Sequence, residues 1–226
     1  MFDLKFKITQ LKNYFLIILA LIFLFFNISL AEEKVTVFDF NKDKISDYKT
    51  YSFKKKTKYT IITTKNGENY LKAEAKGQAS GLGKKIKINL KKTPILNITW
   101  KIEQGIPGIK EDTKKGHDFA ARVSVIKEVG KLPWQKNAMN YVFSSNKKIN
   151  TYWQGPYRKQ IIDYVASSLN DQNINKWVTI RLNVKEHFKK FLNMNLNEID
   201  GVAIMTDTDN TQRKAISYYK NIFFSN

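Results

Sequence analysis

The sequence predicts an all-β protein, an antiparallel β-sandwich of jelly-roll type with one short helix. Three observations support this fold class. Polar and apolar residues alternate with a period of two along most of the chain beyond residue 34, as in strands that bury one face. β-Branched and aromatic residues are concentrated in the same segments. Helical periodicity is confined to one short segment, so the sheets are expected to pack against each other.

The predicted strands begin at the start of the alternating region. Residues 35–40 alternate and form the first strand. Segments 59–63 and 70–73 also alternate, and they flank Asn66-Gly67. An Asn-Gly pair between two such runs indicates a β-hairpin, because both turn positions favour a positive φ. Further strands are predicted at residues 84–90, 96–103, 118–126, 139–145, 177–184, 200–206 and 216–224.

One short helix is predicted over residues 185–192. Four apolar side chains there fall at i, i+4, i+7 and i+8 and share one helical face: Val184, Phe188, Phe191 and Leu192. Segment 160–169 is compatible with either a strand or a helix. Because many short strands separated by turn residues accompany this helix, two packed antiparallel sheets are the expected architecture.

The N-terminal segment has the pattern of a secretory signal peptide. Basic residues precede an apolar run over 14–26, and Ser29-Leu30-Ala31 supplies small residues at a cleavage site. The run is shorter than the roughly 20 apolar residues that span a bilayer. We therefore expect cleavage near Ala31 and a periplasmic or secreted protein. The alternative is an uncleaved anchor over 13–31, the one segment expected to contact a membrane.

Residues 32–226 are expected to form a single β-sandwich domain, because no Pro-rich or Gly-rich linker divides them. The chain has no cysteine, which excludes disulfides and thiolate metal sites. Removal of residues 1–31 takes away three Lys and one Asp and changes the net charge from +19 to +17. Only four basic residues are Arg, the residue that nucleic-acid readers favour for bidentate contacts. We therefore predict no nucleic-acid partner.

Several blocks of the sequence resemble the signature of one bacterial family. They are Phe38-Asp39-Phe40, Ala79-Ser80-Gly81-Leu82, Gly116-His117-Asp118-Phe119-Ala120-Ala121-Arg122-Val123, Asn140-Tyr141-Val142-Phe143-Ser144-Ser145, Ala203-Ile204-Met205-Thr206-Asp207-Thr208-Asp209-Asn210-Thr211 and Tyr218-Tyr219-Lys220-Asn221-Ile222. In these blocks the chain is similar to an uncharacterised exported family, domain of unknown function family 3047. The resemblance implies an exported domain similar to jelly-roll (galactose-binding-like) carbohydrate-binding modules, and it implies no assigned activity. The family usually has Asp where this chain has His117.

The predicted strand over 118–126 has an apolar face and a polar face. Alternate residues such as Phe119 and Val123 are expected in the core, which leaves Asp118 and Arg122 on the opposite side. On a jelly roll that side can be the ligand surface, so Asp118, Arg122 and Asn140 are candidate contacts to sugar hydroxyls or a carboxylate. The alternative is an Asp118–Arg122 ion pair on one strand face.

Oxygen-bearing side chains cluster after the predicted strand at 200–206. Asp207, Asp209 and Asn210 are candidate ligands for a structural calcium ion, which prefers carboxylate and amide oxygens. The spacing resembles the start of an EF-hand loop but does not continue as one. The alternative is turn formation, because Asp and Asn side chains commonly bond their own backbone in turns. No other cofactor is predicted.

Aromatic residues follow the central strands, namely Trp134, Tyr152, Trp153 and Tyr157. Flat rings at the mouth of a sandwich can stack on sugar faces, so Trp153 and Tyr157 complete the predicted ligand site. The alternative is that the loop folds back and buries its rings.

The sequence leaves the function open between three classes. The leading hypothesis is a non-catalytic glycan-binding or other ligand-binding domain of the cell envelope. The first alternative is an envelope hydrolase in which Asp118 acts with Asp207 or Asp209, since glycoside hydrolysis needs only two carboxylates. The second alternative is a structural domain that binds a protein partner along a sheet edge. The oligomeric state is not predicted.

Overall fold

The computed structural model describes residues 33–132, 135–170 and 172–226, which form one unit with two seven-stranded sheets. The first sheet contains β1 (Lys34–Phe38), β3 (Lys58–Thr63), β4 (Asn69–Lys76), β6 (Ile95–Gln104), β11 (Val178–Asn183), β13 (Lys214–Tyr219) and β14 (Ile222–Ser225). The second contains β2 (Lys49–Lys54), β5 (Ala79–Asn89), β7 (Phe119–Glu128), β8 (Lys136–Ser144), β9 (Tyr152–Gln154), β10 (Ile161–Ser168) and β12 (Glu198–Asp207). The predicted signal peptide over 1–31 lies outside the described residues.

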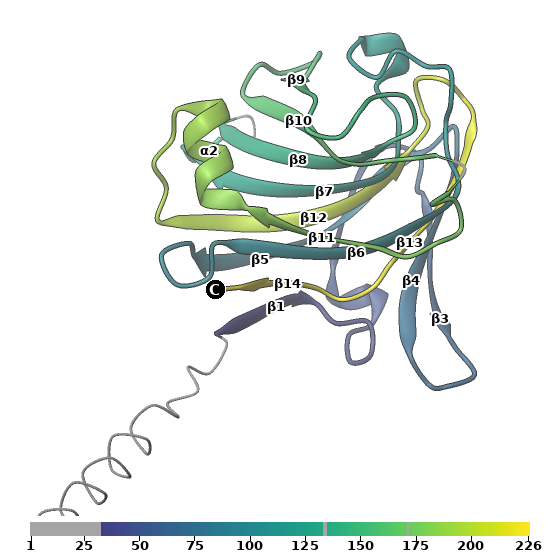
Figure 1. Cartoon of the computed structure of the whole chain (residues 1–226), viewed down its shortest axis with the longest axis horizontal. Coiled ribbons are helices and arrows are strands. Elements are labelled where there is room, and N and C mark those ends of the chain that lie inside the picture. Colours follow the sequence, from purple (N-terminus) through teal and green to yellow (C-terminus); the bar gives the residue numbers. More distant parts are fainter. Residues whose placement is uncertain (1–32, 133–134, 171) are drawn as a thin grey trace, which may run out of the picture. The chain divides into compact units, whose positions relative to one another are not determined.

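In both sheets, strands that are neighbours in space are often not consecutive in sequence. The first sheet runs β1-β14-β6-β13-β4-β3, with β11 also paired to β6, and the second runs β2-β5-β12-β7-β8-β10-β9. Figure 1 shows the two layers stacked, with β8, β7 and β12 in one and β6, β11 and β14 in the other. The predicted all-β sandwich with one short helix is confirmed. One pair departs from the antiparallel pattern, because β8 and β10 are parallel.

The core lies between the two sheets. It is built from alternate residues of each strand, such as Val123 and Val125 of β7 facing Ile98 and Trp100 of β6, and all four side chains are buried. From Arg122 onward, every second residue of β7 therefore points away from the first sheet. The expectation that Phe119 lies in this core was wrong, because the register between β7 and β12 shifts between Arg122 and Phe119, and Phe119 packs with Val142, Val165 and Trp153 on the other side. We call that side of the second sheet its outer face.

The helix α2 (Val184–Leu192) lies at one end of the sandwich (Figure 1). Asn183 caps its N-terminus by accepting a hydrogen bond from the backbone of Glu186 (3.1 Å). Its buried residue Phe188 packs into the core. His187 is half-buried against the rings of Tyr141 and Tyr164. Within the described residues, no helix has the length and hydrophobicity needed to cross a membrane.

The predicted hairpin at Asn66-Gly67 is confirmed, with a different turn. Thr63 pairs with Asn69, and the amide of Gly67 donates to the carbonyl of Thr64 (3.0 Å). Only Gly67 of the Asn-Gly pair has a positive φ, 78°. The amide of Thr64 also donates to the carbonyl of Glu68 (2.8 Å), so the loop is the three-residue connection 65–67 with glycine at the left-handed position, the next most common hairpin type.

The structure decides one strand assignment that the sequence left open and differs from the sequence expectation at others. Segment 160–169 contains a strand, β10, and the single strand expected at 216–224 is divided into β13 and β14. Asn221 stands at this division, where its side chain accepts from the amide of Phe40 (3.0 Å) and donates to Asp39 (3.1 Å). The expectation missed β2 and the short β9.

Candidate ligand-binding face

One row of residues crosses the whole outer face of the second sheet. The strand registers place its members side by side in the order Lys49, Gly83, Ala203, Ser124, Asn140, Asp163 and Trp153. We call this the central row. Ala203 and Ser124 are partly exposed, whereas Asn140 and Asp163 are buried. The outer face therefore has an open half over β5, β12 and β7 and a closed half over β8, β10 and β9.

A chain of hydrogen bonds fills the closed half. Ser124 donates to Asn140 Oδ1 (2.6 Å), and Asn140 Nδ2 donates to Asp163 Oδ1 (2.8 Å). The second carboxylate oxygen of Asp163 lies 2.8 Å from His117 Nε2. Asp163 is 0 % exposed, and each of its two carboxylate oxygens has a hydrogen-bond partner within the protein. These hydrogen bonds offset the free-energy cost of burying a carboxylate.

Arg122 and Asp207 form a buried ion pair beside this chain. The distance from Arg122 Nη2 to Asp207 Oδ1 is 2.6 Å, and Arg122 is 6 % exposed. The guanidinium of Arg122 is not oriented to form a hydrogen bond with Asp207 Oδ1. Arg122 Nε also has no acceptor among the described residues. Burial raises the pKa of Asp207 to about 6, although the charges of Arg122 and His117 oppose that rise. Arg122 also lies over the ring of Phe119, 5.0 Å from its centroid.

Asp118 holds the turn that follows β12. One carboxylate oxygen accepts from the backbone and side-chain amides of Asn210 (3.1 and 3.0 Å). The other accepts from the backbone amide and hydroxyl of Thr211 (2.7 and 2.6 Å). The side chain of Asn210 is also occupied, since its oxygen accepts from Tyr157 (2.7 Å). The predicted Asp118–Arg122 ion pair is replaced by Arg122–Asp207.

The carboxylates that approach one another here are Asp118, Asp207 and Asp209. One oxygen from each lies within 4.8 Å of the others. Three carboxylates could suit calcium, but both oxygens of Asp118 already accept two hydrogen bonds each. Arg122 also supplies a positive charge at Asp207. These residues fit a cation poorly, and the arrangement favours the turn-forming alternative.

The predicted aromatic residues separate into different environments. Trp153 is partly buried and stacks on Phe119 (centroids 6.4 Å apart, planes at 24°). Tyr157 is 56 % exposed, and its ring lies 5.7 Å from that of His117. Tyr152 is exposed and packs on Phe191 at the end of α2. Trp134 lies outside the described residues. The structure thus brings Asp118, Arg122, Asn140, Trp153 and Tyr157 into one region, where only the two aromatic residues reach solvent.

The open half contains a residue that the sequence expectation missed. The ring of Tyr51, on β2, lies across Gly83, because a Cβ atom at Gly83 would come within 2.7 Å of the ring. The same Cβ would be 3.6 Å from Ala203, so small residues form the floor beside the ring. The alternation of Lys49, Tyr51 and Phe53 with hydroxyl residues was the available signal for this strand.

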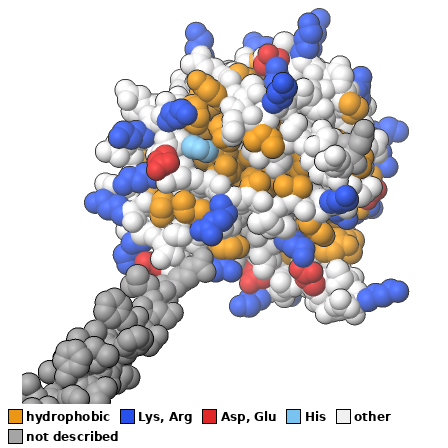
Figure 2. All heavy atoms as spheres, viewed as in Figure 1, with side chains coloured by type: hydrophobic (Ala, Val, Ile, Leu, Met, Phe, Trp, Pro, Cys, Tyr) orange, Lys and Arg blue, Asp and Glu red, His pale blue; other side chains and the backbone are white. Residues whose placement is uncertain are grey.

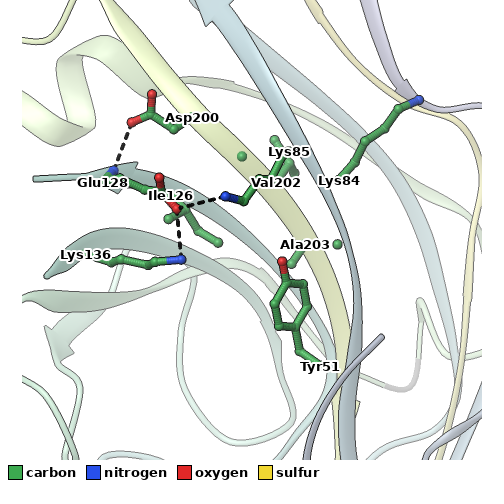
Figure 3. Close-up of a pocket in the computed structure, with 11 residues that line it drawn as sticks. Tyr51, Lys84, Lys85, Ile126, Glu128, Lys136, Asp200, Val202 and Ala203 are labelled. Atoms are coloured by element: carbon green, nitrogen blue, oxygen red, sulfur yellow. Dashed lines mark hydrogen bonds and ion pairs between the residues drawn. The ribbon is translucent and has the colours of Figure 1, made fainter. Parts of the chain in front are cut away.

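A shallow hollow adjoins Tyr51, and we call it the Tyr51 hollow. Its walls include Tyr51, Gly83, Ala203, Lys85, Glu128 and Lys136. Figure 3 shows the ammonium groups of Lys85 and Lys136 directed toward the carboxylate of Glu128, at 4.0 and 2.9 Å. Lys136 is the main reason that the pKa of Glu128 lies below its ordinary value. The hollow combines a flat ring with charged hydrogen-bonding groups.

The fold and this face define a β-sandwich with a polar face that is open over one half. The chain belongs to a family described as "Protein of unknown function (DUF3047)", whose model matches residues 46–223. This confirms the family resemblance of the signature blocks. A search of curated protein sequences found no match.

Solved structures of other proteins share only distant similarity with the chain. The family 30 carbohydrate-binding module of a Clostridium thermocellum cellulosomal cellulase has 10% identity and a TM-score of 0.46, and the match covers 85% of this chain and 96% of that one. The xyloglucanase domain of NopAA from Sinorhizobium fredii, solved with cellobiose, has 10% identity and a TM-score of 0.43, with 81% and 100% covered. At these TM-scores nothing about the chain's ligand follows from either match.

Proposed function

We propose that the protein is an exported, non-catalytic binding domain of the cell envelope and that its outer face takes a glycan. The observation that carries this proposal is the ring of Tyr51, which lies across Gly83 beside Ala203 at an open part of the sheet. A ring that lies against a floor of small residues can present its other side to a sugar once the exposed side chain of Lys49, whose ammonium lies 5.2 Å from the ring centroid, moves aside.

Polar groups beside Tyr51 support a glycan over an apolar ligand. Lys85, Glu128 and Lys136 line the same hollow, and Ser124 is partly exposed in the central row. Ammonium, carboxylate and hydroxyl groups together can donate to and accept from sugar hydroxyls. The hollow itself is small, about 30 Å³, so a glycan would lie along the surface, with the ring of Tyr51 for stacking and these groups for polar contacts.

The closed half serves as the rigid support of this face. Asp118, Arg122 and Asn140 are nearly inaccessible to solvent, so a ligand reaches them only if the loops move. Their contacts within the protein are numerous and directional. In this proposal they position the strands and the turn after β12, and Tyr157 is the part of the predicted site that can meet a ligand directly.

Export rests on the N-terminal sequence. Residues 1–31 have the basic, apolar and small-residue segments of a signal peptide. A periplasmic or secreted location would give the protein access to envelope polysaccharides. Cell fractionation and N-terminal sequencing of the processed protein test this part of the proposal, with Glu32 as the expected first residue.

The experiment is calorimetric titration of the protein with neutral and acidic polysaccharides. Tyr51→Ala is expected to weaken polysaccharide binding by about 3- to 10-fold, because one stacking contact is lost. Tyr152→Ala is the matched control, because Tyr152 is an exposed tyrosine of β9 at the opposite edge of the same sheet. An absence of binding across the panel would contradict the proposal. Binding that depends on Tyr157 and not on Tyr51 would move the site to the closed half.

A further inference from the structure

A second pocket lies beside the closed half and is separate from the Tyr51 hollow. Its volume is about 420 Å³, and its lining includes Ile109, Lys110, Thr113, Lys114, Lys115 and Thr211. We call it the lysine pocket. Most of the lining comes from the connection between β6 and β7, and Thr211 comes from the turn that Asp118 holds.

The backbone around the lysine pocket is fixed by local hydrogen bonds. The hydroxyl and the amide of Thr113 both donate to the carbonyl of Lys110 (2.8 and 3.0 Å). Gly116 packs so closely that a Cβ atom there would lie 2.5 Å from the same carbonyl. The hydroxyl of Tyr157, which donates to Asn210, also lies 3.0 Å from the carbonyl of Lys114, so Tyr157 links the loop to the closed half. The pocket is therefore largely formed before a ligand arrives, which lowers the entropic cost of binding.

The lysines of this pocket form no ion pair within the described part of the chain, although the charge of Lys110 acts on Asp112 and Lys114 Nζ lies 5.7 Å from the ring centroid of Tyr157. Lys110, Lys114 and Lys115 have no carboxylate within ion-pair distance there, a state that they share with eighteen other described lysines, whereas eleven lysines are paired. Asp112 lies in the same loop, but its carboxylate is paired with Lys147 at 3.1 Å. Because three lysines line one pocket, an anion bound there would be attracted by each of them.

A single ligand that occupies both the lysine pocket and the Tyr51 hollow has to be polymeric. Its residues 109–116 precede the start of β7, and the Tyr51 hollow includes Glu128 at the end of β7. The ten residues of β7 span about 30 Å at roughly 3.3 Å per residue. One ligand reaches both places only if it is a chain. The pocket lining contains no Arg, the side chain best suited to bidentate phosphate contacts, so a nucleic acid is a poorer match.

We propose that the lysine pocket binds the anionic groups, carboxylate or sulfate, of an acidic polysaccharide. This inference rests on the proposed function, because it specifies the chemical class of the glycan. Figure 2 shows Lys and Arg side chains over the visible face and rim, with few acidic ones between them. Such a distribution attracts any polyanion, so the specific contribution of the pocket has to be separated from that of net charge.

The test is calorimetric titration with polygalacturonate, dextran sulfate and neutral dextran at near-physiological ionic strength. The variant Lys110→Gln/Lys114→Gln/Lys115→Gln removes the pocket's charge. The matched control is Lys65→Gln/Lys91→Gln/Lys176→Gln, which removes the same charge from exposed lysines that also have no ion pair among the described residues. We expect about tenfold weaker binding of an acidic polymer by the pocket variant, since three exposed ionic contacts are lost. The control is expected to bind nearly as tightly as the unmodified protein.

The probes also separate the possible sources of the anion. Polygalacturonate presents carboxylates and dextran sulfate presents sulfate esters. The polymer that binds more tightly therefore identifies the preferred anionic group. Equal losses in the pocket and control variants would overturn the inference, because net charge alone would then explain binding. Tighter binding of duplex DNA or of anionic lipid vesicles than of either polymer would overturn the ligand class.

The inference and the proposed function fail in different ways. If neutral and acidic polymers bind equally and Tyr51→Ala weakens both, the proposed function stands and the lysine pocket is excluded. If only acidic polymers bind, with losses confined to the pocket variant, the inference stands and the Tyr51 hollow is excluded as their site. All six lysines are exposed, so the variants are expected to fold normally, and thermal unfolding verifies this.

Discussion

Asn140 and Asp163 are joined by a hydrogen bond of 2.8 Å across the parallel pair β8–β10. Both side chains point to the outer face, and both are buried there because His117 and its loop cover them. The pair links the one parallel connection of the second sheet to a loop that precedes β7. The closed half of the face therefore combines polar contacts with a small apolar cluster of Phe119, Val142, Val165 and Trp153, whereas the core between the sheets is mainly apolar.

Substitution of Asn140 tests this polar support. Asn140→Ala would leave one oxygen of buried Asp163 without its donor and the hydroxyl of Ser124 without its acceptor. We expect the free energy of unfolding to fall by about 2–3 kcal/mol, the cost of unsatisfied buried polar groups. Urea denaturation measures it. Asn137→Ala, a partly exposed residue of the same strand, is the control and should cost far less. Equal costs would contradict the supporting role.

Asp118 distinguishes a structural role from the hydrolase alternative. Asp118→Asn keeps the shape but can no longer accept four hydrogen bonds from the turn at Asn210 and Thr211. We expect a loss of about 1–3 kcal/mol in the free energy of unfolding, measured by urea denaturation. Asp209→Asn is the control, because Asp209 is partly exposed and accepts one long side-chain bond of 3.4 Å. A polysaccharide-cleaving activity abolished by Asp118→Asn at unchanged stability would favour the hydrolase.

Calcium is expected to have no effect on stability. Arg122 already supplies the positive charge beside Asp207, and Asp118 has no oxygen left unsatisfied. A cation would have to displace these contacts to bind the three carboxylates. Thermal unfolding in excess calcium and in a chelator should give the same midpoint. A midpoint raised by calcium, and abolished by Asp209→Asn, would instead establish the predicted structural ion.

The fold was predictable because the alternation of polar and apolar residues along each strand is a local pattern. The candidate site was predictable only in part. Strand periodicity located most of the core, and the Asn-Gly pair located the hairpin. The burial of Asp118 depends on Asn210, which is 92 residues distant, and no local pattern encodes such a contact. Tyr51 was missed because β2 is largely exposed, so its sequence lacks the strong apolar positions that mark a buried strand.

Asp207 should make stability depend on pH in the acidic range. Its folded pKa of about 6 lies above its ordinary value of 3.8, so between these values the folded state binds more protons than the unfolded state. Stability contributed by the protonated form is therefore lost as the pH rises from about 4 to 6. The difference is at most about 3 kcal/mol.

Asp207→Asn removes this dependence. Because Arg122 then loses its partner, the variant is expected to be less stable overall, and the informative quantity is the change in the free energy of unfolding between about pH 4 and 6. His187 acts oppositely in this range, since burial lowers its pKa to about 4, and it is present in both proteins. Urea denaturation across the range should show a smaller decline with pH for the variant. Parallel profiles would contradict the raised pKa.

Gly83 is expected to matter only through Tyr51. In Gly83→Ala the new methyl group would meet the ring at 2.7 Å, so the ring of this edge strand has to tilt away from the sheet and lose its flat presentation. We expect glycan affinity to fall by about the same factor as in Tyr51→Ala, roughly 3- to 10-fold. In a protein that already carries Tyr51→Ala, the alanine at Gly83 meets no ring and should reduce affinity no further. Calorimetric titration of both single variants and the double variant gives the coupling between the two positions. Additive losses would mean that Gly83→Ala weakens binding by a route that does not involve the ring of Tyr51. The proposed stacking of Tyr51 on the glycan would then have no support from this coupling.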